Sequence, residues 1–187
     1  MVEKETLRKF LLLLRNHYLT FYPDSIQHLN NQISKNICKY IKHTGIDTCA
    51  LYWPIQSEYD IQPVIKRLHN QGIKVVLPFV SQKKRPLDFF PYTPGQFQVD
   101  KVGLSIPVSR ETKFVPDLIL APLVGIDKMG NRLGYGGGYY DRTLSGISKK
   151  VMYIGVGYSF QKVLSIHVTK KDVPLNGYID DVNINIF

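Results

Sequence analysis

Three stretches rich in apolar residues, each bounded by polar or turn-forming residues, constrain the fold of this chain most strongly. They are Ile73–Val80, Asp117–Pro122 and Val151–Tyr158. A strand with little alternation between apolar and polar residues is typical of a sheet whose two faces are both covered, as in parallel sheets flanked by helices. We therefore predict that these stretches are buried strands of a largely parallel sheet.

Amphipathic helical patterns occupy segments before and between these strands. Apolar residues recur at a spacing of three or four, which places them on one face of a helix. Glycine follows two of the patterns, at a position where helices commonly end. Helices are expected over residues 3–20, from a cap at Asp24 or Ser25 to Gly45, and over residues 60–71. A short fourth helix is expected to begin at Asp141.

Shorter β-type runs complete the pattern. Strands are expected at Thr48–Trp53, at Leu87–Tyr92 towards an edge of the sheet, and once within residues 178–187, whereas residues 93–113 look like a loop. Strands that alternate with helices indicate an α/β fold with a mostly parallel sheet and helices on both faces. The length of 187 residues favours one domain over residues 1–187.

The chain is basic, with 24 lysines and arginines against 15 aspartates and glutamates, and a formal net charge of +9. Such a charge fits either an ordinary basic surface or an anionic partner. The candidate partners are a nucleic acid, a membrane, and a phosphorylated or polycarboxylate small molecule. Composition leaves these alternatives open.

Cysteine usage and the N-terminal segment favour a cytoplasmic location. Cys38 and Cys49 show neither a paired-thiol motif nor metal-ligand spacing, so we expect reduced thiols. The N-terminal segment is charged and lacks the layout of a signal peptide. The apolar run Phe10–Leu14 is too short to span a bilayer, which takes about 20 residues.

The segment GNRLGYGGGYYDR, residues 130–142, carries the strongest functional signal. Glycine allows backbone conformations with positive φ and lets a ligand approach closely, and consecutive N–H groups in such a loop can form an anion-binding concavity. Arg132 and Arg142 flank the cluster, and guanidinium groups suit phosphate oxygens. Asp141 offers the hard oxygen that Mg²⁺ prefers.

These residue types together indicate a site for a triphosphate and a metal ion. The segment matches neither the Walker A pattern nor G-x-G-x-x-G. The structural alternative is a tight turn between two elements, with its tyrosines packed into the core.

Residues 117–142, DLILAPLVGIDKMGNRLGYGGGYYDR, resemble the signature of the 5-formyltetrahydrofolate cyclo-ligase (methenyltetrahydrofolate synthetase) family. The resemblance extends to KETLR near the N-terminus, to YWPIQSEYD at residues 52–60, and to YIGVGYSFQ near the C-terminal end. The sequence departs from the family pattern at Ile126, where Phe is common, and at Ile106, where Glu is frequent.

The resemblance implies a three-layer α/β/α sandwich with a mixed, mostly parallel sheet. It also implies an ATP-dependent ligase of folate one-carbon metabolism, which converts 5-formyltetrahydrofolate to 5,10-methenyltetrahydrofolate and uses Mg²⁺. No nucleic-acid or membrane partner is expected, and the chain is expected to be a monomer or a weak homodimer.

Site residues follow from the resemblance together with the residue chemistry. The predicted ATP-binding residues are Lys4, Arg8, Arg132, Gly134, Tyr135, Gly136, Gly137, Gly138, Tyr139 and Arg142. The predicted substrate-binding residues are Trp53, Glu58, Tyr139 and Tyr140, and the predicted metal ligands are Asp141 and Asp172. Arg142 and Tyr140 are the predicted catalytic residues.

Two other functions remain open at this stage. A catalytically inactive nucleotide-binding regulator would keep the glycine segment and bind ATP without turning over a formyl folate. A basic nucleic-acid-binding module would use the net positive charge and the tyrosines, although no recognised binding motif supports it.

Overall fold

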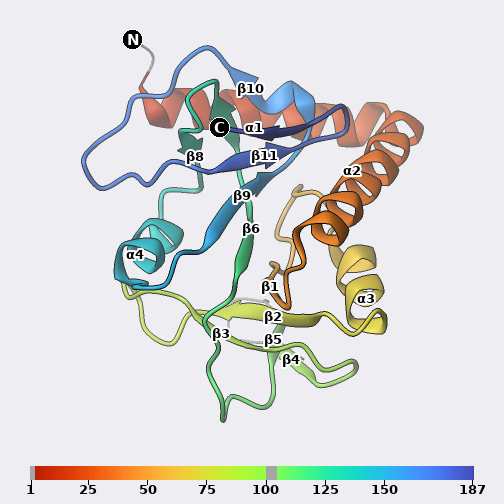
Figure 1. Ribbon diagram of the computed structural model, residues 1–187. Coiled ribbons are helices and arrows are strands. Elements are labelled where there is room, and N and C mark those ends of the chain that lie inside the picture. The colour runs from red at the N-terminus through yellow and green to blue at the C-terminus, as the bar shows by residue number, and fades with distance from the viewer. Residues whose placement is uncertain (1–2, 100–104) are drawn as a thin grey trace.

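A seven-stranded mixed sheet forms the centre of the computed structural model, which describes residues 3–99 and 105–187 (Figure 1). The strand order is β12-β11-β9-β6-β1-β2-β3. The strands are β1 (Thr48–Ala50), β2 (Lys74–Phe79), β3 (Asp88–Pro91), β6 (Leu118–Pro122), β9 (Met152–Val156), β11 (Gly177–Ile179) and β12 (Ile184–Ile186). The pairs from β11 to β2 are parallel, and only the edge strands β3 and β12 are antiparallel in this sheet. The predicted α/β fold with a mostly parallel sheet is therefore confirmed.

Two small sheets flank the central one. One joins β10 (Lys162–Val163), β7 (Gly125–Asp127) and β8 (Arg132–Leu133), and the other joins β4 (Phe97–Val99) and β5 (Ser105–Pro107). The prediction of a loop over residues 93–113 was therefore wrong at β4 and β5, because strands of three residues are too short to show an alternating pattern. Residues 100–104 of that segment lie outside the described residues.

The helices form where amphipathic patterns predicted them. They are α1 (Lys4–Phe21), α2 (Pro23–Thr44), α3 (Gln62–Asn70) and α4 (Tyr139–Gly146). Helix α2 begins at Pro23, so the expected caps lie inside its first turn; proline suits this position because its missing N–H would have no partner there. It ends at Gly45, whose φ of 62° is the left-handed conformation typical of helix ends. Helix α4 begins two residues before the expected Asp141.

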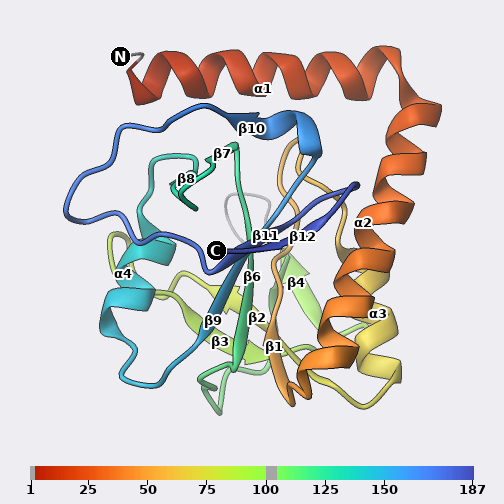
Figure 2. The ribbon, with the colours of Figure 1, turned by 45° about the horizontal axis from the view of Figure 1, so that its top comes forward.

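Helices cover both faces of the central sheet. Ile33 and Ile37 of α2 and Ile65 of α3 pack in the core on one face, and Tyr140 and Leu144 of α4 pack on the other. Helix α1 crosses the end of the sheet above β7, β8 and β10, as Figure 2 shows. In the described part of the chain, no helix combines the length and the apolar character needed to traverse a bilayer.

The carboxyl ends of β1, β2 and β6 point towards the same region beneath α1. Trp53 follows β1, Val80 follows β2 and Pro122 ends β6, and all three line one cleft. Ligands of open α/β sheets bind at this edge. The fold thus places a candidate functional site at this edge of the sheet.

Candidate functional site

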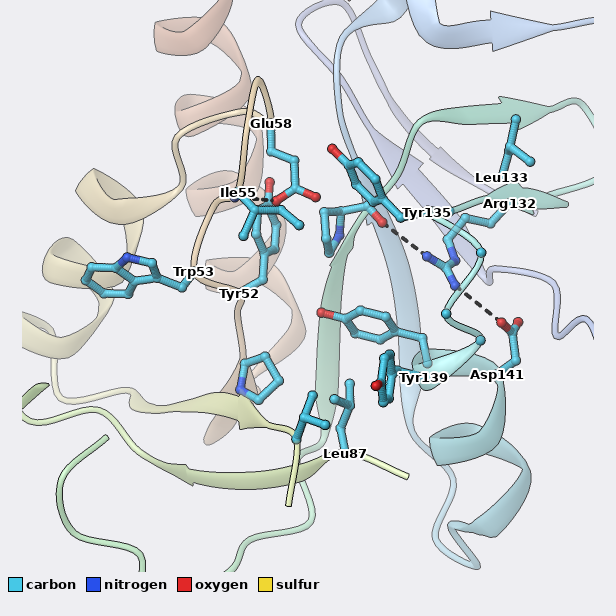
Figure 3. A pocket seen from close by; sticks show the side chains of 18 of the residues that line it. Tyr52, Trp53, Ile55, Glu58, Leu87, Arg132, Leu133, Tyr135, Tyr139 and Asp141 are labelled. Carbon is cyan, nitrogen blue, oxygen red and sulfur yellow. Dashed lines mark hydrogen bonds and ion pairs between the residues drawn. The ribbon is translucent and has the colours of Figure 1, made fainter. Parts of the chain in front are cut away.

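The cleft has a volume of about 650 Å³ and is formed by segments far apart in sequence (Figure 3). The glycine segment and the first turn of α4 form one wall, the loop after β1 forms the facing wall, and the start of α1 contributes two cations. Every predicted site residue except Arg142 lines this cleft: Lys4, Arg8, Trp53, Glu58, Arg132, Gly134, Tyr135, Gly136, Gly137, Gly138, Tyr139, Tyr140, Asp141 and Asp172.

Glycine is required at specific positions of the turn between β8 and α4. Gly136 has a φ of 94° and Gly138 a φ of 62°, both in the region that side-chain-bearing residues rarely adopt. Gly138 is also the N-cap of α4, so the turn leads directly into a helix N-terminus at the cleft. Free N–H groups and the positive end of the helix dipole favour an anion at such a position.

Arginine side chains hold and line the glycine wall. Arg8 donates from Nε to the carbonyl oxygen of Gly134 at 2.8 Å, which ties α1 to the turn. Arg132 donates from Nη1 to the carbonyl of Pro122 at 3.3 Å, and its Nη2 lies 3.5 Å from an oxygen of Asp141 (Figure 3). Both cations border the cleft, so an anionic group there meets two guanidinium groups.

Arg142 differs from the other predicted residues because it does not line the cleft, although it contacts two residues that do. It donates from Nη2 to the carbonyl of Gly137 at 2.7 Å, and its guanidinium carbon lies 5.0 Å from the ring centre of Tyr139. It is not among the residues that line the cleft. In this arrangement Arg142 supports the glycine turn from behind.

The two predicted metal ligands already have partners. Asp172 forms an ion pair with Lys4 at 2.8 Å and accepts hydrogen bonds from Thr169. Partial burial acts to raise the pKa of Asp172, but the hydrogen bonds from Lys4 and Thr169 hold that pKa below its usual value. Asp141 accepts a hydrogen bond from the Val173 N–H at 3.1 Å. Across the described residues, no group of three or more metal-binding side chains is found.

Glu58 is the most perturbed acid of the cleft. Its side chain is buried, its Oε2 accepts the Ile55 N–H at 2.9 Å, and its Oε1 has no hydrogen-bond partner among the described residues. Burial raises the pKa of Glu58 to about 7, against the opposing influence of the Ile55 N–H, the Arg15 charge and the nearby Tyr135 hydroxyl, which does not reach hydrogen-bond geometry with Oε1. Such an oxygen is suited to a ligand that donates hydrogen bonds.

Aromatic side chains border the same region. Trp53 lies beside Phe97, with ring centres 5.1 Å apart, and Tyr140 packs beneath Arg132, whose guanidinium carbon is 5.2 Å from the ring centre. Burial raises the pKa of Tyr140 well above its usual value, so its hydroxyl stays protonated and can donate a hydrogen bond. These groups suit a flat ligand with polar edges.

Sequence reasoning missed one charged residue beside the cleft, Arg15. It lies on α1 and is only 1% exposed. A signal was present in the sequence, because Arg15 follows Leu11 by four residues and so shares its buried face.

Comparison with known proteins supports a family assignment. The sequence model of the 5-formyltetrahydrofolate cyclo-ligase family matches residues 1–179. The chain belongs to this family. It is thus a cyclo-ligase family enzyme, from an ATP-using family of folate one-carbon metabolism.

Cyclo-ligases of known identity match most of the chain. The 5-formyltetrahydrofolate cyclo-ligase of Escherichia coli is 28% identical over 170 residues, which cover 87% of this chain and 93% of that protein. The Haemophilus influenzae cyclo-ligase is 32% identical over 157 residues, which cover 80% and 84%.

Solved structures agree with this assignment. The 5,10-methenyltetrahydrofolate synthetase of Aquifex aeolicus superposes with a TM-score of 0.83 at 27% identity, covering 98% of this chain and 92% of that one. The 5,10-methenyltetrahydrofolate synthetase of Mycoplasma pneumoniae superposes with a TM-score of 0.76 at 29% identity, covering 96% of this chain and 99% of that one.

Ile106, where the sequence departs from the family pattern, is one of the residues that line the cleft.

Proposed function

We propose that this enzyme converts 5-formyltetrahydrofolate to 5,10-methenyltetrahydrofolate and hydrolyses ATP to ADP and phosphate. One observation carries the proposal: a single cleft joins a glycine turn bordered by cations to a buried carboxylate with an unpartnered oxygen. The first feature suits a polyphosphate, and the second suits the hydrogen-bond donors of a pterin ring.

The chemistry explains why both ligands must share one cleft. A formamide carbonyl is a poor electrophile, and its oxygen is a poor leaving group. Transfer of the γ-phosphoryl group to the formyl oxygen forms a P–O bond and releases ADP. The N10 amine then attacks the formyl carbon and loses its proton to solvent, the C–O bond breaks, and phosphate leaves as the ring closes. Positioning and electrostatics dominate phosphoryl transfer in general.

The nucleotide half of the cleft is assigned to the glycine wall. Backbone N–H groups of residues 134–138 cradle the phosphates, and Arg8 and Arg132 neutralise their charge. Lys4 adds a third cation, since Lys4 and Arg8 are four residues apart on one helix face. Arg142 keeps a proposed role in catalysis through the turn, because its guanidinium holds the Gly137 carbonyl.

Asp141 and Asp172 are the residues proposed to hold Mg²⁺. Two carboxylates suffice for this ion, because Mg²⁺ is usually bound by one or two carboxylates together with waters and substrate phosphates. Both aspartates line the cleft: Asp172 meets Lys4 and Thr169 through Oδ2, whereas Asp141 meets Arg132 through Oδ2 and the Val173 N–H through Oδ1. When bound, the ion would neutralise charge on the transferring phosphates.

The folate half is assigned to the facing wall. Glu58 accepts hydrogen bonds from the pterin, Trp53 borders the ring, and Tyr139 and Tyr140 lie near the formyl group. The protonated hydroxyl of Tyr140 donates to an oxygen that gains negative charge during transfer. The net charge of +9 also suits a substrate with an anionic glutamate tail.

A direct assay tests the proposal. Protein, ATP, Mg²⁺ and 5-formyltetrahydrofolate are mixed, and near-ultraviolet absorbance of the methenyl product is followed, with ATP omitted as the control. We expect ATP-dependent growth of this absorbance. If no product forms at every pH tested between 6 and 9, the proposal is overturned. If the protein then still binds ATP, the result identifies a nucleotide-binding regulator.

A further inference from the structure

Arg15 joins three separate segments behind the cleft. From α1 it donates Nε to the Ser57 hydroxyl at 3.0 Å, Nη1 to the Leu123 carbonyl at 3.1 Å, and Nη2 to the Tyr135 hydroxyl at 2.5 Å. Ser57 precedes Glu58 on the folate wall, whereas Tyr135 belongs to the glycine segment. One guanidinium group therefore contacts both walls of the cleft.

The chemistry of this contact is specific to arginine. A guanidinium presents five N–H donors in a rigid planar fork, whereas a lysine ammonium is a point charge on a flexible stem. Three partners in different directions fix the fork, and the three donors meet three neutral oxygens. Within the described residues, Arg15 makes no salt bridge.

Stability alone does not account for a buried arginine at this position. Taking a charge out of water is costly, and no ion pair of Arg15 is found among the described residues to offset that cost. Leu11, one turn earlier on the same face of α1, packs in a small apolar cluster, whereas Arg15 aims three N–H donors at oxygens of Ser57, Leu123 and Tyr135. The directed bonds of Arg15 therefore call for a role beyond packing.

We propose that Arg15 is a positioning residue that fixes the glycine segment relative to the folate loop, and so aligns the two substrates for phosphoryl transfer. This inference rests on the proposed function, because it assigns the nucleotide to one wall and the folate to the other. Arg15 is not among the residues that line the cleft, so its proposed role is to hold residues that do rather than to bind a substrate. Its loss would leave each half able to bind while their relative placement loosens.

The first test separates alignment from binding. In Arg15→Lys the charge remains and the fork is lost, so we expect kcat to fall about tenfold or more, while KM for each substrate changes by less than about threefold. Arg67→Lys, on the exposed face of α3, is the matched control and should leave both constants unchanged. A rise in both KM values with kcat unchanged would overturn the proposal.

The second test begins in the wild-type background, where its main result does not depend on the fold of an Arg15 variant. Ser57→Ala and Tyr135→Phe each remove one hydroxyl acceptor, and no direct hydrogen bond joins these two residues in the described structure. We expect their effects on kcat/KM to be coupled by a factor of about three or more in the wild-type background. In the Arg15→Met background, the coupling should vanish. Additive effects in the wild type would overturn the proposal.

Failure of the proposed function gives a different result. If the wild type forms no methenyl product, the same cycle is run on the affinity for ATP in the presence of 5-formyltetrahydrofolate, measured by titration calorimetry. If the effects of Ser57→Ala and Tyr135→Phe are coupled through Arg15 but no product forms, the positioning role of Arg15 stands and the proposed reaction is rejected. If product forms but the two effects are not coupled, the proposed reaction stands and the positioning role is rejected.

Discussion

Among the acidic side chains of the cleft, Glu58 has the most strongly perturbed pKa. Its carboxyl is buried, and one oxygen has no partner within the described structure. The fold tolerates this arrangement because the acid can be neutral, with a pKa raised by burial to about 7. A folate donor would supply the missing partner and favour the ionised form.

Glu58 makes the free protein less stable as pH rises. Because its folded-state pKa lies above the usual value near 4.5, ionisation costs folding free energy from about pH 5 upwards, and the cost is fully present above about pH 7. Glu58→Gln lacks this cost, so its advantage over the wild type should grow across that window to ~3 kcal/mol at most. Urea unfolding from pH 5 to pH 8 measures it, with the exposed Glu111→Gln as control. Parallel pH curves for wild type and Glu58→Gln would contradict the assignment.

Asp141 is expected to matter more for activity than for stability. In Asp141→Asn the amide oxygen can still accept the Val173 N–H, while the negative charge beside Arg132 is lost. We expect the Mg²⁺ concentration for half-maximal activity to rise by about tenfold or more, with little change in melting temperature. Asp117→Asn, which breaks an ion pair with Lys149 outside the cleft, is the control. Equal losses of stability and activity in Asp141→Asn would count against a metal role.

At the scale of elements, the turn from β8 into α4 forms the proposed phosphate cradle. An alanine at Gly138 would have to adopt a φ of 62°, and its Cβ would lie 2.9 Å from Arg142 Nη1. Gly146, at the other end of α4, faces open space. A glycine-to-alanine substitution is therefore strained at Gly138, which caps α4, and unstrained at Gly146, the last residue of that helix.

Gly138→Ala is expected to cost about 1–2 kcal/mol of stability and to weaken ATP binding, because the left-handed backbone disfavours a side chain. Gly146→Ala should be neutral or stabilising by up to about 1 kcal/mol. Thermal unfolding and calorimetric titration with ATP compare the two. If Gly138→Ala binds ATP as tightly as Gly146→Ala does, the turn is not the phosphate cradle.

The elements also show what sequence alone could predict. The strands Lys74–Phe79, Leu118–Pro122 and Met152–Val156 were predictable because burial on both faces leaves a local apolar signature. The strands β7, β8 and β10 were not, because two or three residues carry no period.

For the site residues as well, the sequence predicted which residues take part, whereas the direction of each side chain depended on tertiary packing. Arg142 follows Asp141 directly in sequence, yet one step along a helix turns the side chain by about 100° and directs Arg142 away from the cleft lining. Arg15 was missed because an arginine on a helix ordinarily faces water, and only the tertiary packing of α1 shows its three partners. Local patterns and the family resemblance thus predicted residues that the fold brings to one cleft, and tertiary packing determined how each side chain is placed there.

At the scale of the whole molecule, the cleft is assembled from segments that the chain brings together only on folding. The predicted site residues that line it lie in four of these segments, residues 4–8, 52–58, 132–141 and 172. A ligand that bridges both walls should therefore reduce local opening in all four at once. It should also stabilise the fold by about 2.7 kcal/mol for each ligand present at a hundred times its Kd.

Amide hydrogen exchange tests this joint protection, because exchange reports local opening segment by segment. With a non-hydrolysable ATP analogue and 5-formyltetrahydrofolate together, we expect slower exchange in residues 4–8, 52–58 and 132–141. A second cleft, lined by basic residues of α2 and α3 including Lys39, Lys42 and Arg67, provides an internal control. Its residues should exchange at unchanged rates, because the cleft shares no lining residue with the first. Protection confined to that second cleft would show that polyphosphate binds by charge alone, and the glycine wall would lose its assigned role.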